Sequence, residues 1–432
     1  MNEAFASLSR EQREVVFEKN GLFAVRACPG SGKTYCVAAR LARLLGTWPF
    51  ERRGIAALSF TNVAWQTVEA ELGRTFGITT PIGHPHYLRT IDSFINQYLI
   101  LPYGHLYLKC GRRPTLVGEP HGSWAGANFY QSGFDKISFD VDGSLSFTRR
   151  DWARADVLEG QADKFFRAKQ GLLAAGYVTQ ADANYIAVWL LENHPVLAGS
   201  LVNRFPCMIL DEAQDTSGSQ MRMLDLLIEA GLSEVMLVGD PDQAIYEWRD
   251  ARPDLFSSKV EAWYVRSAVL EENRRSSTAI CDATYGISTL DEASKAVDPV
   301  VAEFGLPPQI IVYSGDVAEL VRRYLSICKD SGVSISPDSV AVLFRSASMA
   351  MEIAAGSAVS PWLEGDLVTG KLALARFLCQ EAEWKLGLEL LERTILRITL
   401  GDTAVDRVAV TGYVESIGVK DFRRAVYGLA VR

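Results

Sequence analysis

The sequence predicts an α/β protein in which short apolar strands run into loops that carry polar and charged residues. Residues 21–26 are typical of a buried strand, and apolar residues from Thr34 to Leu45 recur at helical spacing. Two further apolar runs, 207–210 and 235–238, each end in acidic residues or lead directly to them. Strand ends of this kind meet at one edge of a parallel sheet, so the loops are expected to form one site.

The loop after the first strand has the pattern of a phosphate-binding loop. Small residues let backbone N–H groups point into one concavity, Lys33 suits the β- and γ-phosphates, and the Thr34 hydroxyl suits Mg²⁺. The loop opens a helix, whose N-terminus favours an anion, although Ala27 stands where the general pattern has glycine. Many kinds of ATPase and GTPase share this pattern, so the loop alone does not select one. The predicted nucleotide contacts here are Pro29, Gly30, Ser31, Gly32, Lys33 and Thr34.

Two acidic residues follow the apolar strand 207–210. Asp211 suits coordination of Mg²⁺, and Glu212 suits a base that activates water. The plainer alternative is a strand followed by a helix over 220–228 that residues 215–217 cap. Next to a phosphate-binding loop, the acidic pair favours nucleotide hydrolysis.

The strand 235–238 leads into a loop that reads Gly239-Asp-Pro-Asp-Gln-Ala-Ile-Tyr-Glu-Trp-Arg249. A glutamine beyond a strand end can touch a γ-phosphate, which gives Gln243 that role. An aromatic residue a few positions later can stack on a nucleic-acid base. Taken alone, Tyr246 and Trp248 are more typical of core aromatics.

In their order from residue 8 to about residue 350, these motifs and their neighbours resemble the UvrD/Rep-type DNA helicases of superfamily one. The resemblance implies a RecA-like P-loop NTPase motor domain with a largely helical insert, plus the start of a second RecA-like domain. It also implies ATP and Mg²⁺ as cofactors and movement along single-stranded DNA in the 3′ to 5′ direction. Gln12 matches the glutamine that recognises adenine in that family, which implies ATP rather than GTP.

The resemblance also assigns residues to DNA and to the far side of the nucleotide. Arg275 matches the arginine that reaches the γ-phosphate, and Arg274 replaces a tyrosine that stacks on adenine. The plainer alternative for this pair is an exposed basic start of a helix. Asp92 stands where the family more often has histidine. The implied DNA contacts are Phe60, Thr61, Asn62, Thr90, Asp92, Tyr246, Trp248 and Arg249.

The motif positions predict a discontinuous first motor domain, an inserted subdomain and a second motor domain that is only begun. Leucines at helical spacing between 361 and 400 favour a further helical insert. The predicted segments are 1–94 with 200–276, the insert 95–199, the start of the second motor domain 277–355, and the helical segment 356–432. Within the third segment, a helix at 317–329 is expected between strands at 308–313 and 340–345.

Basic residues gather between positions 149 and 169 of the inserted subdomain. Such a run is more often a solvated helix face, and contact with DNA is the alternative. The residues are Arg149, Arg150, Arg154, Lys164, Arg167 and Lys169.

The later motifs of the family, which include another phosphate-binding arginine, have no counterpart between residues 350 and 432. Three explanations are open: a piece of a longer chain, a short protein that a partner completes, or a relative kept for binding. A sheet without its later strands leaves apolar edges uncovered. We therefore expect self-association, a partner or lower stability.

Composition favours a soluble, cytoplasmic, multidomain enzyme. The formal net charge of −8 over 432 residues argues against indiscriminate coating of nucleic acid, but a local basic channel stays compatible with it. The N-terminus has no basic region followed by an apolar stretch, and no run of about eighteen apolar residues occurs, so no membrane contact is expected. Seven scattered cysteines without a Cys-x-x-Cys pair fit reduced thiols.

Three functions remain open on the sequence. The first is an ATP-dependent DNA helicase that acts on single-stranded and tailed duplex DNA. The second is a nucleotide-regulated, helicase-like DNA-binding component of a nuclease or phage-defence complex, and its protein partner would be a nuclease subunit. The third is a nucleotide-binding enzyme unrelated to DNA, such as a kinase, against which Gln12, residues 60–62, the Asp211-Glu-x-Gln214 motif and Gln243 argue together.

Overall fold

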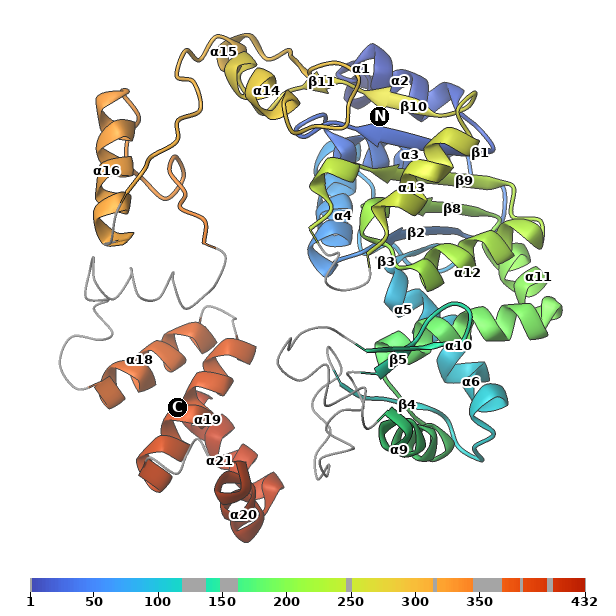
Figure 1. The fold of residues 1–432 in the computed structure, drawn as a ribbon, viewed down its shortest axis with the longest axis vertical. Coiled ribbons are helices and arrows are strands. Elements are labelled where there is room, and N and C mark those ends of the chain that lie inside the picture. The colour runs from blue at the N-terminus through green and yellow to red at the C-terminus, as the bar shows by residue number, and fades with distance from the viewer. Residues whose placement is uncertain are drawn as a thin grey trace. The chain divides into compact units, whose positions relative to one another are not determined.

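The computed structural model describes most of the chain, in two units that are treated separately below (Figure 1). The first unit spans residues 1–308 and the second spans 309–432. The described residues are 2–118, 137–147, 162–245, 251–313, 317–344, 367–380, 384–401 and 407–431.

A six-stranded sheet forms the centre of the first unit, and every neighbouring pair in it is parallel. The predicted α/β fold is therefore confirmed, and the strands predicted at 21–26, 207–210 and 235–238 are all present. In spatial order, the strands are β10 (Ala268–Leu270), β1 (Leu22–Ala27), β9 (Glu234–Gly239), β8 (Cys207–Leu210), β2 (Ile55–Ser59) and β3 (Tyr87–Thr90).

Alternate residues of the strands face two separate apolar cores, as the pleat of a buried sheet requires. Phe23 and Val25 of β1 face one core, which α3 (Lys33–Gly46) and α4 (Asn62–Phe76) cover. Ala24 faces the other core, which includes Phe256. The helices on that side include α12 (Gly218–Glu229) and α13 (Pro253–Ala262), and Figure 1 shows them across the sheet from α4.

Helix α12 begins as the sequence alternative for this segment predicted. Ser217 is its N-cap and accepts a hydrogen bond from the backbone N–H of Gln220, while the Gln220 side chain accepts one from the backbone N–H of Ser217. This capping box satisfies two donors at the helix start. A capped helix and an acidic pair thus occur in the same segment.

Within the described residues 91–118, 137–147 and 162–206, the chain between β3 and β8 is mainly helical, as predicted for the insert. Its helices pack on the second core through an aromatic cluster in which the ring centroids of Tyr98 and Phe205 are 5.0 Å apart. Short strand pairs lie within it. The elements are α5 (Ile91–Ile95), η2 (Asn96–Ile100), α6 (Leu101–Leu108), β4 (Thr115–Leu116), β5 (Ile137–Phe139), β6 (Leu145–Phe147), α9 (Ala162–Ala174), β7 (Tyr177–Val178), α10 (Gln180–Asn193) and α11 (Pro195–Arg204).

One residue of the predicted basic face of the insert, Lys169, does not lie on the surface. Lys169 is buried, and its Nζ lies 2.7 Å from Oδ1 of Asp182, which is buried as well. Lys164 and Arg167 of the same helix are exposed. Arg149, Arg150 and Arg154 lie outside the described residues. Lys169 is therefore part of an internal ion pair and is not available to DNA.

After the sheet, the first unit continues into small elements that pack beside the phosphate-binding loop. Helix α14 (Thr278–Tyr285) begins after its N-cap Ser277. The other elements are β11 (Glu272–Asn273), β12 (Lys295–Ala296), which pairs with it, and α15 (Pro299–Ala302).

The regular elements that the structure describes in the second unit are helices, and loops connect to them. Helix α16 (Val317–Asp330) agrees with the prediction, but the strands predicted at 308–313 and 340–345 are wrong within the described residues 308–313 and 340–344. Ile310, Val312 and Leu343 are 96%, 82% and 93% exposed. A strand needs a neighbour for its N–H and C=O groups, and the sheets of the described chain include none at these residues.

Four helices at the C-terminal end share a small core of their own. Ala375, Cys379, Leu391, Phe422 and Val426 are among its buried residues. No helix in the described parts of the chain is long and apolar enough to cross a membrane. The four helices are α18 (Leu367–Gln380), α19 (Trp384–Leu400), α20 (Arg407–Ile417) and α21 (Val419–Val431).

Candidate nucleotide-binding site

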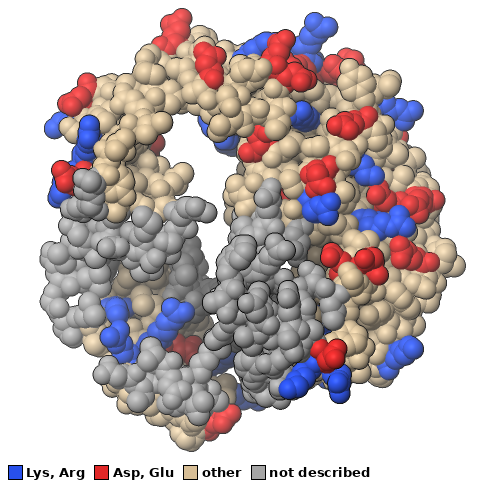
Figure 2. All heavy atoms as spheres, in the orientation of Figure 1, with Lys and Arg blue, Asp and Glu red and all other residues tan. Residues whose placement is uncertain are grey.

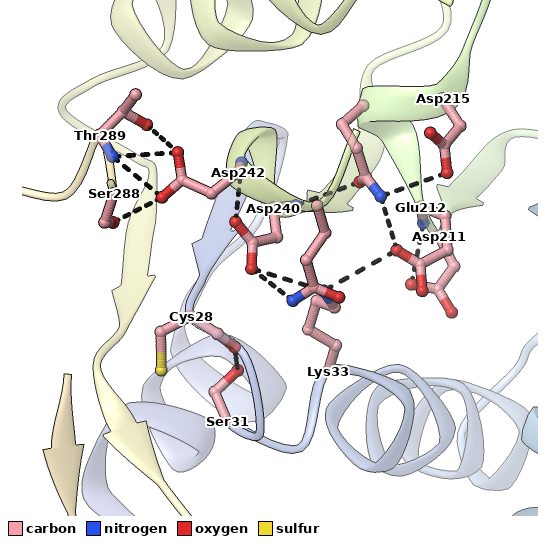
Figure 3. A network of polar contacts seen from close by, with 12 residues as sticks. Cys28, Ser31, Lys33, Asp211, Glu212, Asp215, Asp240, Asp242, Ser288 and Thr289 are labelled. Carbon is pink, nitrogen blue, oxygen red and sulfur yellow. Dashed lines mark hydrogen bonds and ion pairs between the residues drawn. The ribbon is translucent and has the colours of Figure 1, made fainter. Parts of the chain in front are cut away.

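The predicted nucleotide motifs meet at the carboxyl ends of the central strands. The phosphate-binding loop follows β1, the acidic pair follows β8 and the Gln243 loop follows β9, and these three strands are neighbours in the sheet. Figure 3 shows the resulting polar network. A loop at a strand's carboxyl end next to the N-terminus of a helix is the usual place for a phosphate in an open parallel sheet.

The phosphate-binding loop turns on two glycines. Gly30 and Gly32 have φ angles of 73° and 78°, which favour residues without a Cβ, and Gly32 is the N-cap of α3. Ala27 is the last residue of β1 and does not have a positive φ, so the missing glycine costs nothing there. Cys28 is buried, and burial together with Asp240 raises the pKa of its thiol to about 12, so it is a neutral packing residue.

Lys33 carries a positive charge into the middle of the site. Its Nζ lies 3.8 Å from Oε2 of Glu212 and 3.9 Å from Oδ2 of Asp240, as Figure 3 shows. The side chain is only 10% exposed. Its Nζ has no hydrogen-bond partner among the described residues. Buried ammonium groups normally have hydrogen-bond acceptors, so the free donors of Lys33 suit the phosphate of a bound ligand.

Asp211 is the second unsatisfied group. Its Oδ2 is buried without a hydrogen-bond partner in the described chain. Burial, with the neighbouring Glu212 charge, raises the pKa of Asp211 to about 7. A divalent cation would reverse that cost by holding the carboxylate ionised. The described residues contain no group of three or more metal-ligating side chains, so Mg²⁺ would depend on Asp211, Thr34 and phosphate oxygens, a set that suits this ion.

Gln214 is a residue whose role the sequence analysis missed. Its buried side chain accepts a hydrogen bond from the backbone N–H of Asp240 at 3.1 Å and donates one to Oε2 of Glu212 at 2.9 Å. It therefore ties the loop after β8 to the loop after β9 and orients the predicted base. The signal was its position two residues beyond the acidic pair, but only the fold shows what it contacts.

Gln243 lies within this network, as predicted. Its Nε2 donates to Oδ2 of Asp240 at 2.5 Å, and Asp240 also faces Lys33. Residues 241–243 form one turn of 3₁₀-helix, η6 (Pro241–Gln243). Asp240 was not assigned a role from the sequence, although it directly follows β9.

Gln12 lies next to the phosphate-binding loop. Its Nε2 donates to the carbonyl of Ser31 at 3.0 Å, and its Oε1 accepts from the backbone N–H of Ser9 at 3.2 Å. A Cβ on Gly32 would stand 2.9 Å from the same Nε2. The amide nitrogen thus supports the loop, the amide oxygen holds the start of the short helix α2 (Arg10–Arg13), and the adenine contact stays a prediction.

The predicted arginine pair adjoins the loop from the other side. The backbone N–H of Arg274 donates to the carbonyl of Gly30 at 3.0 Å, and a Cβ on Gly30 would stand 2.7 Å from that of Arg275. Asn273 holds the turn by accepting from the N–H groups of Arg275 and Ser276. The Arg275 side chain is exposed and forms no hydrogen bond or ion pair with the described residues, whereas Arg274 pairs with Glu272.

The predicted DNA residues follow the neighbouring strands β2 and β3. Thr61 and Thr90 are the N-caps of α4 and α5, Asn62 accepts from the indole N–H of Trp65, and Asp92 accepts from Gln220 at 2.8 Å. Phe60 is half-buried. These structural roles leave their DNA contacts as predictions, and Tyr246, Trp248 and Arg249 lie outside the described residues.

On the face seen in Figure 2, the described residues form no continuous stripe of positive or of negative charge. Acidic and basic side chains alternate there over the described residues of the first unit. A mixed surface of this kind does not attract nucleic acid by charge alone.

A parallel sheet with a phosphate-binding loop, an acidic pair and a glutamine loop at adjacent strand ends defines a RecA-like P-loop NTPase. Comparison with known families then narrows the class. The family model described as UvrD/REP helicase N-terminal domain matches residues 8–115 and 146–262, just over half of the chain. The chain belongs to the UvrD/REP helicase family.

Individual relatives agree. The ATP-dependent DNA helicase Rep of Escherichia coli is 27% identical over 64% of this chain and 42% of its own length. The ATP-dependent DNA helicase PcrA of Staphylococcus epidermidis is 24% identical over 80% of this chain and 49% of its own. An ATP-dependent helicase/nuclease subunit of Streptococcus pneumoniae is 37% identical over 25% of this chain and 9% of its own. The chain spans less than half the length of these relatives.

Proposed function

We propose that this chain is the ATP-binding part of a DNA helicase or translocase that moves along single-stranded DNA in the 3′ to 5′ direction. The observation that carries the nucleotide site is the buried Nζ of Lys33, which has no hydrogen-bond partner among the described residues and faces Glu212 and Asp240. The family and its helicase relatives support DNA as the substrate, and the direction rests on resemblance alone. A cytoplasmic location is part of the same proposal.

ATP with Mg²⁺ supplies a phosphoanhydride bond whose hydrolysis drives movement. Lys33 and the backbone N–H groups of the loop hold the phosphates, and Asp211 with Thr34 holds the metal ion. Glu212 takes a proton from the attacking water, since Gln214 keeps its carboxylate turned into the site. Arg275, whose guanidinium is exposed and unpaired in the described chain, completes the site from the segment that follows β10.

DNA would cross the ends of β2 and β3 in this proposal. Asn62 is exposed there and Phe60 is half-buried, which suits stacking and backbone contacts near the N-termini of α4 and α5. Gln243 would connect the nucleotide to Tyr246, Trp248 and Arg249. Single-stranded and tailed duplex DNA are the proposed substrates.

A second candidate is a regulatory component that needs a nuclease partner. The observation that favours it is the 37% identity with the Streptococcus pneumoniae helicase/nuclease protein over 112 residues. In that case the chain binds ATP and DNA, and turnover or unwinding requires the partner. Phage defence is one setting for such a complex.

ATP hydrolysis by this chain, measured with and without a single-stranded oligonucleotide, tests the proposal. We expect DNA to stimulate turnover, and Glu212→Gln to abolish the stimulated rate while ATP still binds. Glu229→Gln is the matched control, because that acid lies on the exposed surface of α12, where it pairs with Arg222. Turnover that ignores DNA would contradict a DNA motor. Intact ATP binding without turnover would favour the partner-dependent component instead.

A further inference from the structure

Asp242, next to Gln243, is bound to a part of the chain far away in sequence. Its carboxylate accepts hydrogen bonds from the Ser288 hydroxyl at 2.5 Å, from the Thr289 hydroxyl at 2.5 Å and from the Thr289 backbone N–H at 3.0 Å. Burial opposes ionisation of Asp242, but these hydrogen bonds outweigh it and lower its pKa. Figure 3 shows the three residues together at one end of the polar network.

The same turn faces the phosphate site with its other end. Asp240 lies 3.9 Å from Nζ of Lys33 and binds the Gln243 side chain, and its Oδ1 also accepts from the backbone N–H of Asp242 at 3.0 Å. Pro241 begins this turn of 3₁₀-helix and fixes one of its φ angles. The turn is therefore short and stiff, so a displacement at Asp240 reaches Asp242 with little loss.

Thr289 is anchored a second time, by the strand that leads to the phosphate-binding loop. Nη2 of Arg26 donates to the Thr289 hydroxyl oxygen at 2.7 Å, and that hydroxyl donates to Asp242. One hydroxyl can serve both contacts, since it has one proton and two lone pairs. Arg26 directly precedes Ala27 in β1 and pairs with Gly239 of β9.

Both Asp242 and Thr289 are exposed. Hydrogen bonds in contact with water contribute little individually, so this contact can be remade without a large barrier. Several charge-assisted bonds to one carboxylate nevertheless define one orientation. These properties suit a link that carries a movement and do not suit a purely structural staple.

We propose that Asp242 is a positioning residue that transmits the nucleotide state of the site to residues 288–290. The inference rests on the proposed ATP site. A γ-phosphate beside Lys33 competes with Asp240 for the Lys33 ammonium and for the amide of Gln243. The turn 240–243 then shifts, and its hydrogen bonds draw residues 288–290 with it toward the phosphate-binding loop. The loop that senses phosphate thereby also positions the segment that follows α14.

Hydrogen–deuterium exchange on the full chain tests the link, with a non-hydrolysable ATP analogue as the probe and its binding measured on the same samples. Thr289 and Leu290 report directly, because their N–H groups donate to Asp242 and to the Ser288 hydroxyl. We expect the analogue to slow exchange at these amides by on the order of tenfold in the unaltered protein. Asp242→Asn should bind the analogue equally well and lose that slowing.

Two further variants distinguish transmission from a general loss of structure. Thr289→Val removes the hydroxyl and should weaken the response, whereas Thr289→Ser keeps the hydroxyl and should restore it. Asp254→Asn is the matched control, because Asp254 is also an exposed aspartate whose pKa a partner, Arg252, lowers, and its carboxylate accepts hydrogen bonds from Arg252 instead of from Ser288 or Thr289. It should respond like the unaltered protein.

The outcomes separate the two proposals. If the unaltered protein binds the analogue but exchange at 288–290 does not change, the link is wrong and the ATP site stands. A full response in Asp242→Asn overturns the link in the same way. If no analogue binds, the proposed ATP site fails, and the link fails with it.

Discussion

Lys33 is a buried charge whose ammonium faces two carboxylates but has no hydrogen-bond partner in the described chain, so its donors stay available to a phosphate. We expect Lys33→Ala to lower ATP turnover by on the order of 100-fold or more, because it removes a donor aimed at developing phosphate charge. The variant should still fold, but the midpoint of its thermal unfolding should fall, because the buried carboxylate of Asp240 loses its neighbouring cation. ATPase assays and calorimetry on the same variant check both expectations. A variant that hydrolyses ATP normally would show that the phosphates bind elsewhere.

The raised pKa of Asp211 predicts that the stability of the folded protein depends on pH. Burial raises its pKa to about 7 in the folded protein, from a usual value near 3.8. The folded state therefore binds more protons between these values, and the contribution of Asp211 to stability falls as the pH rises from about 4 to about 7. We expect Asp211→Asn to be more stable than the unaltered protein at pH 8, by up to a few kcal/mol, and to show little difference at pH 4.

Thermal unfolding of the Asp211→Asn and unaltered proteins from pH 4 to pH 8, without Mg²⁺ or nucleotide, measures this difference. Only the difference between the two proteins is diagnostic, since other carboxylates titrate in both. A constant difference at every pH would mean that Asp211 does not titrate in this range. Addition of Mg²⁺ and ATP should stabilise the unaltered protein much more than Asp211→Asn.

Helices α9 and α10 of the insert are joined by the ion pair of Lys169 and Asp182. Both side chains are fully buried, and Asp182 also accepts from the backbone N–H and the hydroxyl of Thr179 at the start of α10. We expect Lys169→Met to destabilise the protein by about 3–5 kcal/mol, because it leaves a buried carboxylate unpaired. Urea unfolding measures the change.

Matched variants show whether the loss comes from the unpaired charge. Arg167→Ala, on the exposed face of the same helix, should change stability by about 0.5 kcal/mol or less. Adding Asp182→Asn to Lys169→Met should recover part of the loss, since the amide oxygen still caps α10 while the buried charge is gone. Equal losses for Lys169→Met and Arg167→Ala would contradict the internal ion pair.

At the level of elements, the sequence correctly predicted the strands that end in motif residues. The apolar runs 21–26, 207–210 and 235–238 end in motif residues, and each is a central strand. The runs 308–313 and 340–345 read in the same way but lack a neighbouring strand in the described chain. An apolar pattern alone does not show whether a segment will pair and form a strand, because pairing depends on chain segments elsewhere.

The residues of the site also fall into those that the sequence predicted and those that it did not. Lys33, Asp211, Glu212 and Gln243 were predicted because each chemical role requires a residue type at a fixed distance from a strand end. The contacts of Gln214 and the burial of Lys169 depend on residues from other elements, which a single sequence does not bring together. Whether Phe60 or Trp248 contacts DNA stays a prediction.

The whole molecule consists of two units with separate cores, and this predicts two separable unfolding reactions. The first unit has two extensive cores around the sheet, whereas the helices of the second share one small cluster. A ligand stabilises only the unit that binds it. Nucleotide should therefore protect residues 1–308 and leave the second unit unchanged.

Buried cysteines report each unit separately, and every cysteine of the chain is a free thiol. Cys36 and Cys207 are buried in the first unit and Cys379 in the second. In mild denaturant, an ATP analogue at 100 times its Kd should slow thiol labelling of Cys36 and Cys207 by about 100-fold, which corresponds to about 2.7 kcal/mol. Labelling of Cys379 should keep its rate. Equal slowing at all three cysteines would mean that the two units unfold together, so that the small helical cluster depends on the nucleotide-binding sheet for its stability.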